Sequence, residues 1–302
     1  MTRRIGFVGL GAMGLPMVQN LARDPGVQIH ALDPSDKPFA VLERHPAWGS
    51  GLLRAATPAA LASCRTVITM LPDSRITNEV ILGDGGLADH LAEGSTIIDM
   101  GSSDPVETMR LVPLLAKRGI SLVDAPVSGS VPKARSGELS IMVGADAVTV
   151  EALRPVLSGM GRQIIVAGSP GAAHAMKALN NYVYAAGLLA VSEAVAIAAR
   201  MGIDTSVFAD VLNASSGRNV ASETKLRPFI LSGDYSGGFA LQLQAKDLAT
   251  AARLQGLAGF DAPQLALCAD LWAQAAGTLP SGADNTAIHK YLMEYCSATA
   301  AE

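Results

Sequence analysis

Cysteine is scarce in this chain, and what it has does not form a pattern. The 302 residues include three cysteines, Cys64, Cys268 and Cys296, which lie far apart and are odd in number. They match neither a metal-binding spacing nor a framework of disulfides, and isolated thiols of this kind are typical of a reducing compartment. We therefore expect a cytoplasmic protein with no metal site.

Charge is also low. Charged residues make up 17% of the chain, the net charge is −4, and there is no basic run. This composition argues against nucleic acid or an anionic membrane as a partner. Together with abundant apolar helices, the low charged fraction favours burial of surface in a homodimer or homotetramer.

Long hydrophobic runs are almost absent. The segment from Tyr182 to Ala199 carries one charge, Glu193, and is near the lower length limit of a membrane-spanning helix. It is rich in alanine and has neither an aromatic belt nor a basic flank, so we interpret it as a buried central helix. The N-terminal MTRRIGFVGLGAMG lacks the apolar region of a signal peptide and is expected to belong to the mature protein.

The two halves of the chain differ in character. Predicted strands alternate with helical segments in the first half, at 4–9, 27–32, 66–71, 95–100, 120–125, 139–144 and 163–168. Such alternation is typical of a parallel sheet covered on both faces, whereas the residues after Gly168 predict only helices. We expect an α/β Rossmann-type domain over 1–165 and an all-α domain over 166–302. A long helix near 170–200 would join them, with the active site in the cleft between the domains.

A G-x-G-x-x-G motif follows the first predicted strand. Gly9 permits the tight turn, Gly11 lets the backbone approach a pyrophosphate, and Gly14 allows close packing of the helix on the strand. Ala12 and Met13 complete this cofactor-binding loop. The motif predicts a dinucleotide site because a strand precedes it and a helix follows it.

Asp33 ends the next predicted strand, 19 residues beyond Gly14, where an acid accepts hydrogen bonds from the adenosine ribose. Its charge repels a 2′-phosphate, and no arginine directly follows it in DPSDKPF, so we predict NAD rather than NADP.

Three further strand ends are expected to face the ligands, which bind outside the carboxyl ends of parallel strands. Leu71 and Pro72 offer an apolar surface to the nicotinamide or ribose, and the hydroxyls of Ser102 and Ser103 are small enough to approach the ribose. Ser128 and Gly129 offer a hydroxyl and N–H groups to a carboxylate. An ordinary turn explains each of these serines as well.

The helix after Gly168 carries Lys177 and Asn181, which are four residues apart and so share a face. Lysine serves as the acid/base of a hydride transfer when burial or a second cation lowers its pKa toward neutrality. Small and apolar neighbours in AAHAMKALNNYVYAAG favour this role over that of a solvated lysine.

Four ordered motifs together resemble the signatures of the β-hydroxyacid dehydrogenases: GLGAMGLPMVQNLA, DAPVSGS, the helix around Lys177, and Lys246-Asp247-Leu248. The resemblance covers nearly the whole chain. It implies NAD-dependent oxidation of a short 3-hydroxy acid, or reduction of its semialdehyde, with 3-hydroxyisobutyrate as the expected substrate. Tartronate semialdehyde is the alternative within the class. A non-catalytic dinucleotide-binding protein is the alternative of another class, and the presence of both Lys177 and Asn181 argues against it.

The resemblance also implies roles for single residues. Lys177 matches the acid/base, Asn181 a residue that holds the substrate, and Ser128 and Gly129 the substrate-carboxylate loop, beside which Ser130 would add a hydroxyl to the substrate pocket. Lys246 matches a lysine near nicotinamide and substrate, and Ser102 a cofactor contact. Asp284 matches an acidic position to which we assign no role, and the SSGR tetrad with Arg218 favours the 3-hydroxyisobutyrate class.

Two positions depart from the family pattern. Ser130 and Ala173 stand where the family usually has glycine. Ser130 puts the identity of the substrate in doubt, and Ala173 adds a methyl near the expected cofactor cleft. His174, which follows, is expected on the helix surface or in packing rather than as a second acid/base.

Overall fold

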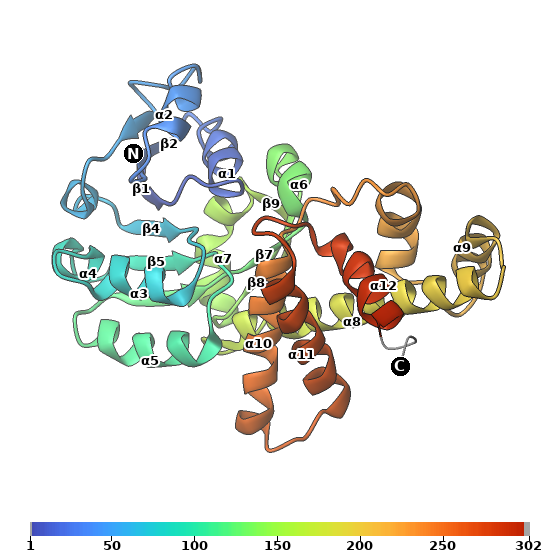
Figure 1. Ribbon diagram of the computed structural model, residues 1–302. Coiled ribbons are helices and arrows are strands. Elements are labelled where there is room, and N and C mark those ends of the chain that lie inside the picture. The colour runs from blue at the N-terminus through green and yellow to red at the C-terminus, as the bar shows by residue number, and fades with distance from the viewer. Residues whose placement is uncertain (1, 299–302) are drawn as a thin grey trace. The chain divides into compact units, whose positions relative to one another are not determined.

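The computed structural model describes the backbone of residues 2–298 and the side chains of residues 2–294, so Cys296 lies outside the described side chains. The chain divides into two compact units, residues 1–177 and 178–302 (Figure 1). The division falls inside a single long helix, α8 (Ala172–Arg200), which begins in the first unit and continues through the second.

A six-stranded parallel sheet with the order β3-β2-β1-β4-β5-β6 is the framework of the first unit. Its strands are β1 (Arg3–Val8), β2 (Val27–Leu32), β3 (Leu52–Arg54), β4 (Thr66–Thr69), β5 (Thr96–Asp99) and β6 (Ser121–Asp124). Ile5 of β1 is in register with Ile29 of β2 on one side and with Thr66 of β4 on the other. The strand order therefore reverses between β1 and β4, where ligands bind in doubly wound sheets.

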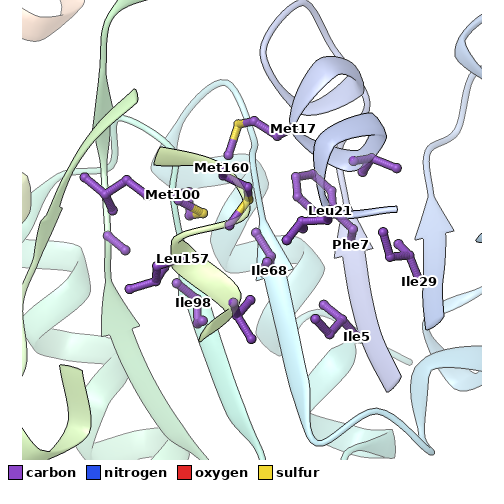
Figure 2. Close-up of a cluster of buried hydrophobic side chains, with 14 of the residues drawn as sticks. Ile5, Phe7, Met17, Leu21, Ile29, Ile68, Ile98, Met100, Leu157 and Met160 are labelled. Carbon is purple, nitrogen blue, oxygen red and sulfur yellow. The ribbon is translucent and has the colours of Figure 1, made fainter. Parts of the chain in front are cut away.

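Apolar side chains from both faces of this sheet are buried beneath helices. Neighbouring residues of one strand point to opposite faces, so Val67 joins one core cluster and Ile68 the other. Figure 2 shows the Ile68 cluster, in which Met17 and Leu21 of α1 lie near Phe7 of β1. The helices of this unit are α1 (Gly14–Leu21), α2 (Lys37–Leu42), the 3-10 helix η1 (Pro58–Leu61), α3 (Ser74–Leu82), α4 (Leu87–His90), α5 (Pro105–Ala116), α6 (Ser130–Ser136) and α7 (Ala147–Leu157).

Three more strands form a separate small sheet. They are β7 (Val127–Ser128), β8 (Leu139–Val143) and β9 (Gly161–Val166), with β7 antiparallel and β9 parallel to β8. All seven predicted strands are present within a few residues, but the last two lie here and not in the parallel sheet. The short strands β3 and β7, of three and two residues, were not predicted.

Only helices occur among the described residues beyond β9, as predicted. After α8 they are α9 (Thr205–Ala214), the π-helix η2 (Ser222–Leu231), α10 (Leu241–Ala258), α11 (Pro263–Thr278), the 3-10 helix η3 (Asn285–Ala287) and α12 (Ile288–Ala298). Trp272 of α11 is completely buried in the core of this second unit, together with Leu188 of α8 and Leu248 of α10.

Helix α8 is long and apolar enough to cross a membrane by length and composition alone, with a mean hydropathy of 1.7 over its most apolar stretch. Of that stretch, 44% is buried inside the structure, and core helices of soluble proteins meet the same criterion. Ala185, Leu188 and Val195 place one face of α8 in the core of the second unit.

Candidate active site

The glycine loop lies at the carboxyl end of β1, and its three glycines are required for different reasons. Gly9 has φ +96°, and a Cβ there would lie 2.4 Å from the carbonyl oxygen of Met70. A Cβ on Gly14 would lie 2.0 Å from the carbonyl oxygen of Gly9, so α1 packs directly on the end of β1. A Cβ on Gly11 would meet no described atom within 4 Å. Gly9 and Gly14 therefore serve the fold, and Gly11 leaves space beside the loop.

Asp33, one residue beyond β2, points back at this loop. Its Oδ2 accepts a hydrogen bond of 2.7 Å from the backbone N–H of Leu10, and its Oδ1 accepts one of 2.8 Å from that of Ser35. A carboxylate oxygen accepts more than one hydrogen bond. The Asp33 carboxylate is therefore fixed beside the glycine loop and retains capacity for the hydroxyls of a ribose.

The ends of β1, β4 and β5 lie side by side. A Cβ on Gly9 would lie 3.0 Å from Leu71 Cδ2, and one on Gly101 would lie 2.8 Å from the carbonyl oxygen of Leu71. Pro72 follows Leu71 and Ser102 follows Gly101. The predicted cofactor residues of the first unit therefore lie together at the carboxyl ends of the parallel strands. Ser103 differs, because it is buried and its hydroxyl donates a 2.6 Å hydrogen bond to Asp99.

In the second unit, Asn181 of α8 belongs to a buried polar network. Its Nδ2 donates a 2.6 Å hydrogen bond to Asp247 of α10, and its backbone carbonyl accepts one of 3.1 Å from Gln244 Nε2. The Nζ of Lys246 lies 3.3 Å from the other Asp247 oxygen. Two predicted site residues, Asn181 and Lys246, therefore share Asp247, which belongs to the motif Lys246-Asp247-Leu248 but was not among the predicted site residues.

Lys177 is half-buried on α8, four residues before Asn181. Because residues four apart lie one turn along a helix, the predicted acid/base and the fixed amide are neighbours on one face.

The chain matches two family descriptions in succession. Residues 4–168 match the NAD binding domain of 6-phosphogluconate dehydrogenase. Residues 171–292 match the family described as NAD-binding of NADP-dependent 3-hydroxyisobutyrate dehydrogenase. The chain is also 38% identical over 248 residues to 2-(hydroxymethyl)glutarate dehydrogenase of Eubacterium barkeri, covering 82% of this chain and 81% of that one. This chain belongs to the β-hydroxyacid dehydrogenase family.

Two further similarities define what this β-hydroxyacid dehydrogenase shares with its relatives. It is 34% identical over 276 residues to the NAD-dependent L-serine dehydrogenase of Pseudomonas aeruginosa, covering 89% of this chain and 91% of that one. A solved structure of 3-hydroxyisobutyrate dehydrogenase from Mycobacterium tuberculosis with L-serine has a TM-score of 0.85 and 30% identity, covering 97% of this chain and 99% of that one. The predicted fold and family are confirmed, and the protein is an NAD(P)-binding oxidoreductase that acts on CH–OH groups.

The loop at residues 128–130, predicted to bind the substrate carboxylate, has two consecutive residues with positive φ angles. Gly129 has φ +137°, and a Cβ there would lie 2.8 Å from Lys133 Cδ. Ser130, where the family usually has glycine, has φ +58°, a left-handed conformation that costs a non-glycine residue about 1 kcal/mol. The structure thus explains why glycine is usual at this position, and Ser130 retains the same backbone with an added hydroxyl. Ala173, the other departure, is completely buried.

Asp284 has a structural role in the dehydrogenase. One carboxylate oxygen accepts hydrogen bonds from the backbone N–H groups of Gly238 and Phe239. The other accepts hydrogen bonds from the backbone N–H and the hydroxyl of Thr286, and so caps η3. Arg218 is exposed and lies 3.6 Å from Glu223 Oε1.

Proposed function

We propose that this dehydrogenase oxidises a 2-substituted 3-hydroxypropanoate to its semialdehyde with NAD. The substrates in the names of its relatives support this class, because all three have a primary alcohol on the carbon next to the one that bears the carboxylate. They differ only in the substituent at C2, which is carboxyethyl in 2-(hydroxymethyl)glutarate, ammonium in serine and methyl in 3-hydroxyisobutyrate. Tartronate semialdehyde is the product of the series with a hydroxyl at C2. We propose the methyl compound as the preferred substrate and the hydroxyl compound as the alternative.

The proposed reaction removes a hydride from C3 of the substrate and the proton from its hydroxyl. Bound NAD would supply the acceptor for the hydride, and the amine of Lys177 takes the hydroxyl proton and returns it in the reverse direction. Ser128, Gly129 and Ser130 bind the substrate carboxylate. Leu71, Pro72 and Ser102 contact the cofactor, and Lys246 supplies positive charge beside nicotinamide and substrate.

The observation that carries this proposal is the position of the Asn181 amide. Its Nδ2 is held at 2.6 Å by the carboxylate of Asp247, which is itself buried and paired with Lys246. Its Oδ1 also accepts a 3.3 Å hydrogen bond from Asn180 Nδ2, so the amide has a fixed orientation and its second N–H faces a defined direction. A fixed amide one helical turn from a lysine can hold the hydroxyl of a substrate in place for proton transfer to that lysine.

Asp33 supports the choice of NAD over NADP. Its charge lies beside the glycine loop, where the ribose 2′-phosphate of NADP would be repelled. The arginine at the end of the neighbouring strand β3, Arg54, already lies 2.6 Å from Asp36 and stacks on the ring of Phe39.

Replacing Lys177 by alanine tests the proposed chemistry. Loss of an acid/base costs on the order of 10²–10⁴ in turnover, so kcat for 3-hydroxyisobutyrate should fall by at least about 100-fold while NADH binding stays unchanged. Lys117→Ala, at an exposed lysine of the same unit, is the matched control. Turnover of Lys177→Ala within a few-fold of wild type refutes the assignment.

The substrate class is tested with NAD and 3-hydroxyisobutyrate, L-serine, 2-(hydroxymethyl)glutarate and glycerate. We expect activity with the series and the highest kcat/KM for the methyl compound. Absence of turnover with all four, in a protein that binds NADH, refutes the proposed class.

A further inference from the structure

His174, the third residue of α8, is completely buried, which agrees with the packing alternative of the sequence prediction and not with the surface alternative. Its ring faces three other elements of the first unit. Nδ1 lies 2.8 Å from Thr108 Oγ1 of α5 and 3.9 Å from Asp124 Oδ2 at the end of β6. Nε2 lies 3.8 Å from Asp99 Oδ2 at the end of β5.

The Thr108 hydroxyl lies within hydrogen-bond distance of two groups, His174 Nδ1 at 2.8 Å and the backbone carbonyl of Asp104, the residue that caps α5, at 3.2 Å. It links the imidazole to α5 in either tautomer, because a hydroxyl accepts from a protonated Nδ1 and donates to an unprotonated one. Nε2 has no hydrogen-bond partner among the atoms that the structure describes, and the nearest charge to it is the Asp99 carboxylate.

The two carboxylates beside His174 organise different parts of the site. Asp124 accepts the backbone N–H groups of Gly171 and His174, at 2.8 and 3.0 Å, and so caps the first turn of α8 from a distant strand. Asp99 accepts the Gly101 N–H and the Ser103 hydroxyl, at 3.2 and 2.6 Å, and so shapes the turn that carries Ser102. Asp99 and Asp124 are neighbours in register.

We infer that His174 is a positioning residue for Lys177, an inference that rests on the acid/base role proposed above. The imidazole hydrogen-bonds to α5 through Thr108 and packs against the carboxylates at the ends of β5 and β6. Lys177 lies about one turn further along the same helix. The position of its amine therefore depends on how His174 holds the first turn of α8. The groups that face the ring are the carboxylates of Asp99 and Asp124 and the hydroxyl of Thr108.

His174→Leu keeps a side chain of similar size and removes both ring nitrogens. Because a displacement of about 1 Å in a catalytic group costs up to about 100-fold in rate, we expect kcat to fall by roughly 10- to 100-fold. The KM for the hydroxy acid and the Kd for NADH should change less than about two-fold. His174→Gln, which keeps a donor and an acceptor, should restore most of the activity.

Thr108→Val keeps His174 and removes the hydrogen-bond partner of its Nδ1, so it should also lower kcat, and this test holds even if His174→Leu does not fold. Thr77→Val, at another buried threonine of the first unit, is the control for general destabilisation and should leave kcat unchanged.

A double-mutant cycle decides whether His174 acts through Lys177. In a Lys177→Ala background, His174→Leu should have almost no further effect on kcat, since the group it positions is gone. Three outcomes overturn the inference. They are an additive loss of kcat in the double mutant, an unchanged kcat in both His174→Leu and Thr108→Val, and a change confined to KM or NADH affinity. A full rate in Lys177→Ala alone refutes instead the proposed function on which the inference rests.

Discussion

Gly11 and Gly14 belong to the same loop, and the structure predicts opposite consequences when each is replaced by alanine. A Cβ at Gly14 would lie 2.0 Å from the carbonyl oxygen of Gly9, whereas one at Gly11 would meet no described atom within 4 Å. Neither glycine has a left-handed φ, so steric contact and not backbone strain decides both outcomes.

The magnitudes follow from these contacts. Carbon–oxygen contacts are ordinarily about 3.3 Å or longer, so Gly14→Ala forces the helix and strand apart by roughly 1 Å. Overpacking of this kind costs about 3 kcal/mol, a large share of a typical free energy of unfolding of about 5–15 kcal/mol. Gly11→Ala should leave the free energy of unfolding unchanged or raise it by up to about 1 kcal/mol, because alanine restricts the unfolded chain.

Cofactor binding should show the reverse order. If a pyrophosphate lies against Gly11, the added methyl keeps it away from the backbone N–H groups, and the Kd for NADH should weaken at least about ten-fold, or about 1.4 kcal/mol. Urea unfolding and fluorescence titration with NADH measure the two effects. Gly256→Ala in α10, where a Cβ would also meet nothing described within 4 Å, is the control that should leave NADH binding intact. NADH affinity of Gly11→Ala within two-fold of wild type, or wild-type stability of Gly14→Ala, refutes the reasoning.

Two other expectations concern charge and protonation. Asp33→Asn keeps an acceptor for the Leu10 N–H but removes the negative charge. The ratio of kcat/KM for NAD to kcat/KM for NADP should therefore fall at least about ten-fold. An unchanged ratio contradicts the assignment of Asp33 to the cofactor ribose. Burial lowers the pKa of His289 below its ordinary value of about 6.5, so below that pH the unfolded chain binds a proton that the folded ring resists. The free energy of unfolding should therefore fall as the pH drops from 7.5 to 5.5, and His289→Gln should reduce that slope; the same slope in both proteins would show that His289 is not its source. Burial also lowers the pKa of His30, so His30 should account for the part of the pH slope that remains in His289→Gln.

Local patterns were sufficient for much of the fold. The glycine motif, the strand alternation and the change to helical sequence after Gly168 depend on neighbouring residues, and they predicted the Rossmann-type sheet and the helices that follow it. The strands β3 and β7 are too short to leave a periodic signal. No local pattern distinguishes β8 and β9 from strands of the main sheet, because only their pairing with β7 places them apart.

The sequence by itself determined which residues we propose for the chemistry: the glycine loop, Asp33, and the lysine and asparagine of α8. Only the tertiary structure decided what holds them. Asn181 and Asp247 are 66 positions apart, as are Thr108 and His174, and each pair meets because packing brings distant elements together. A polar side chain in an apolar segment shows that a partner must exist, since its burial is costly without one. Which residue that partner is depends on contacts that no short stretch of sequence contains.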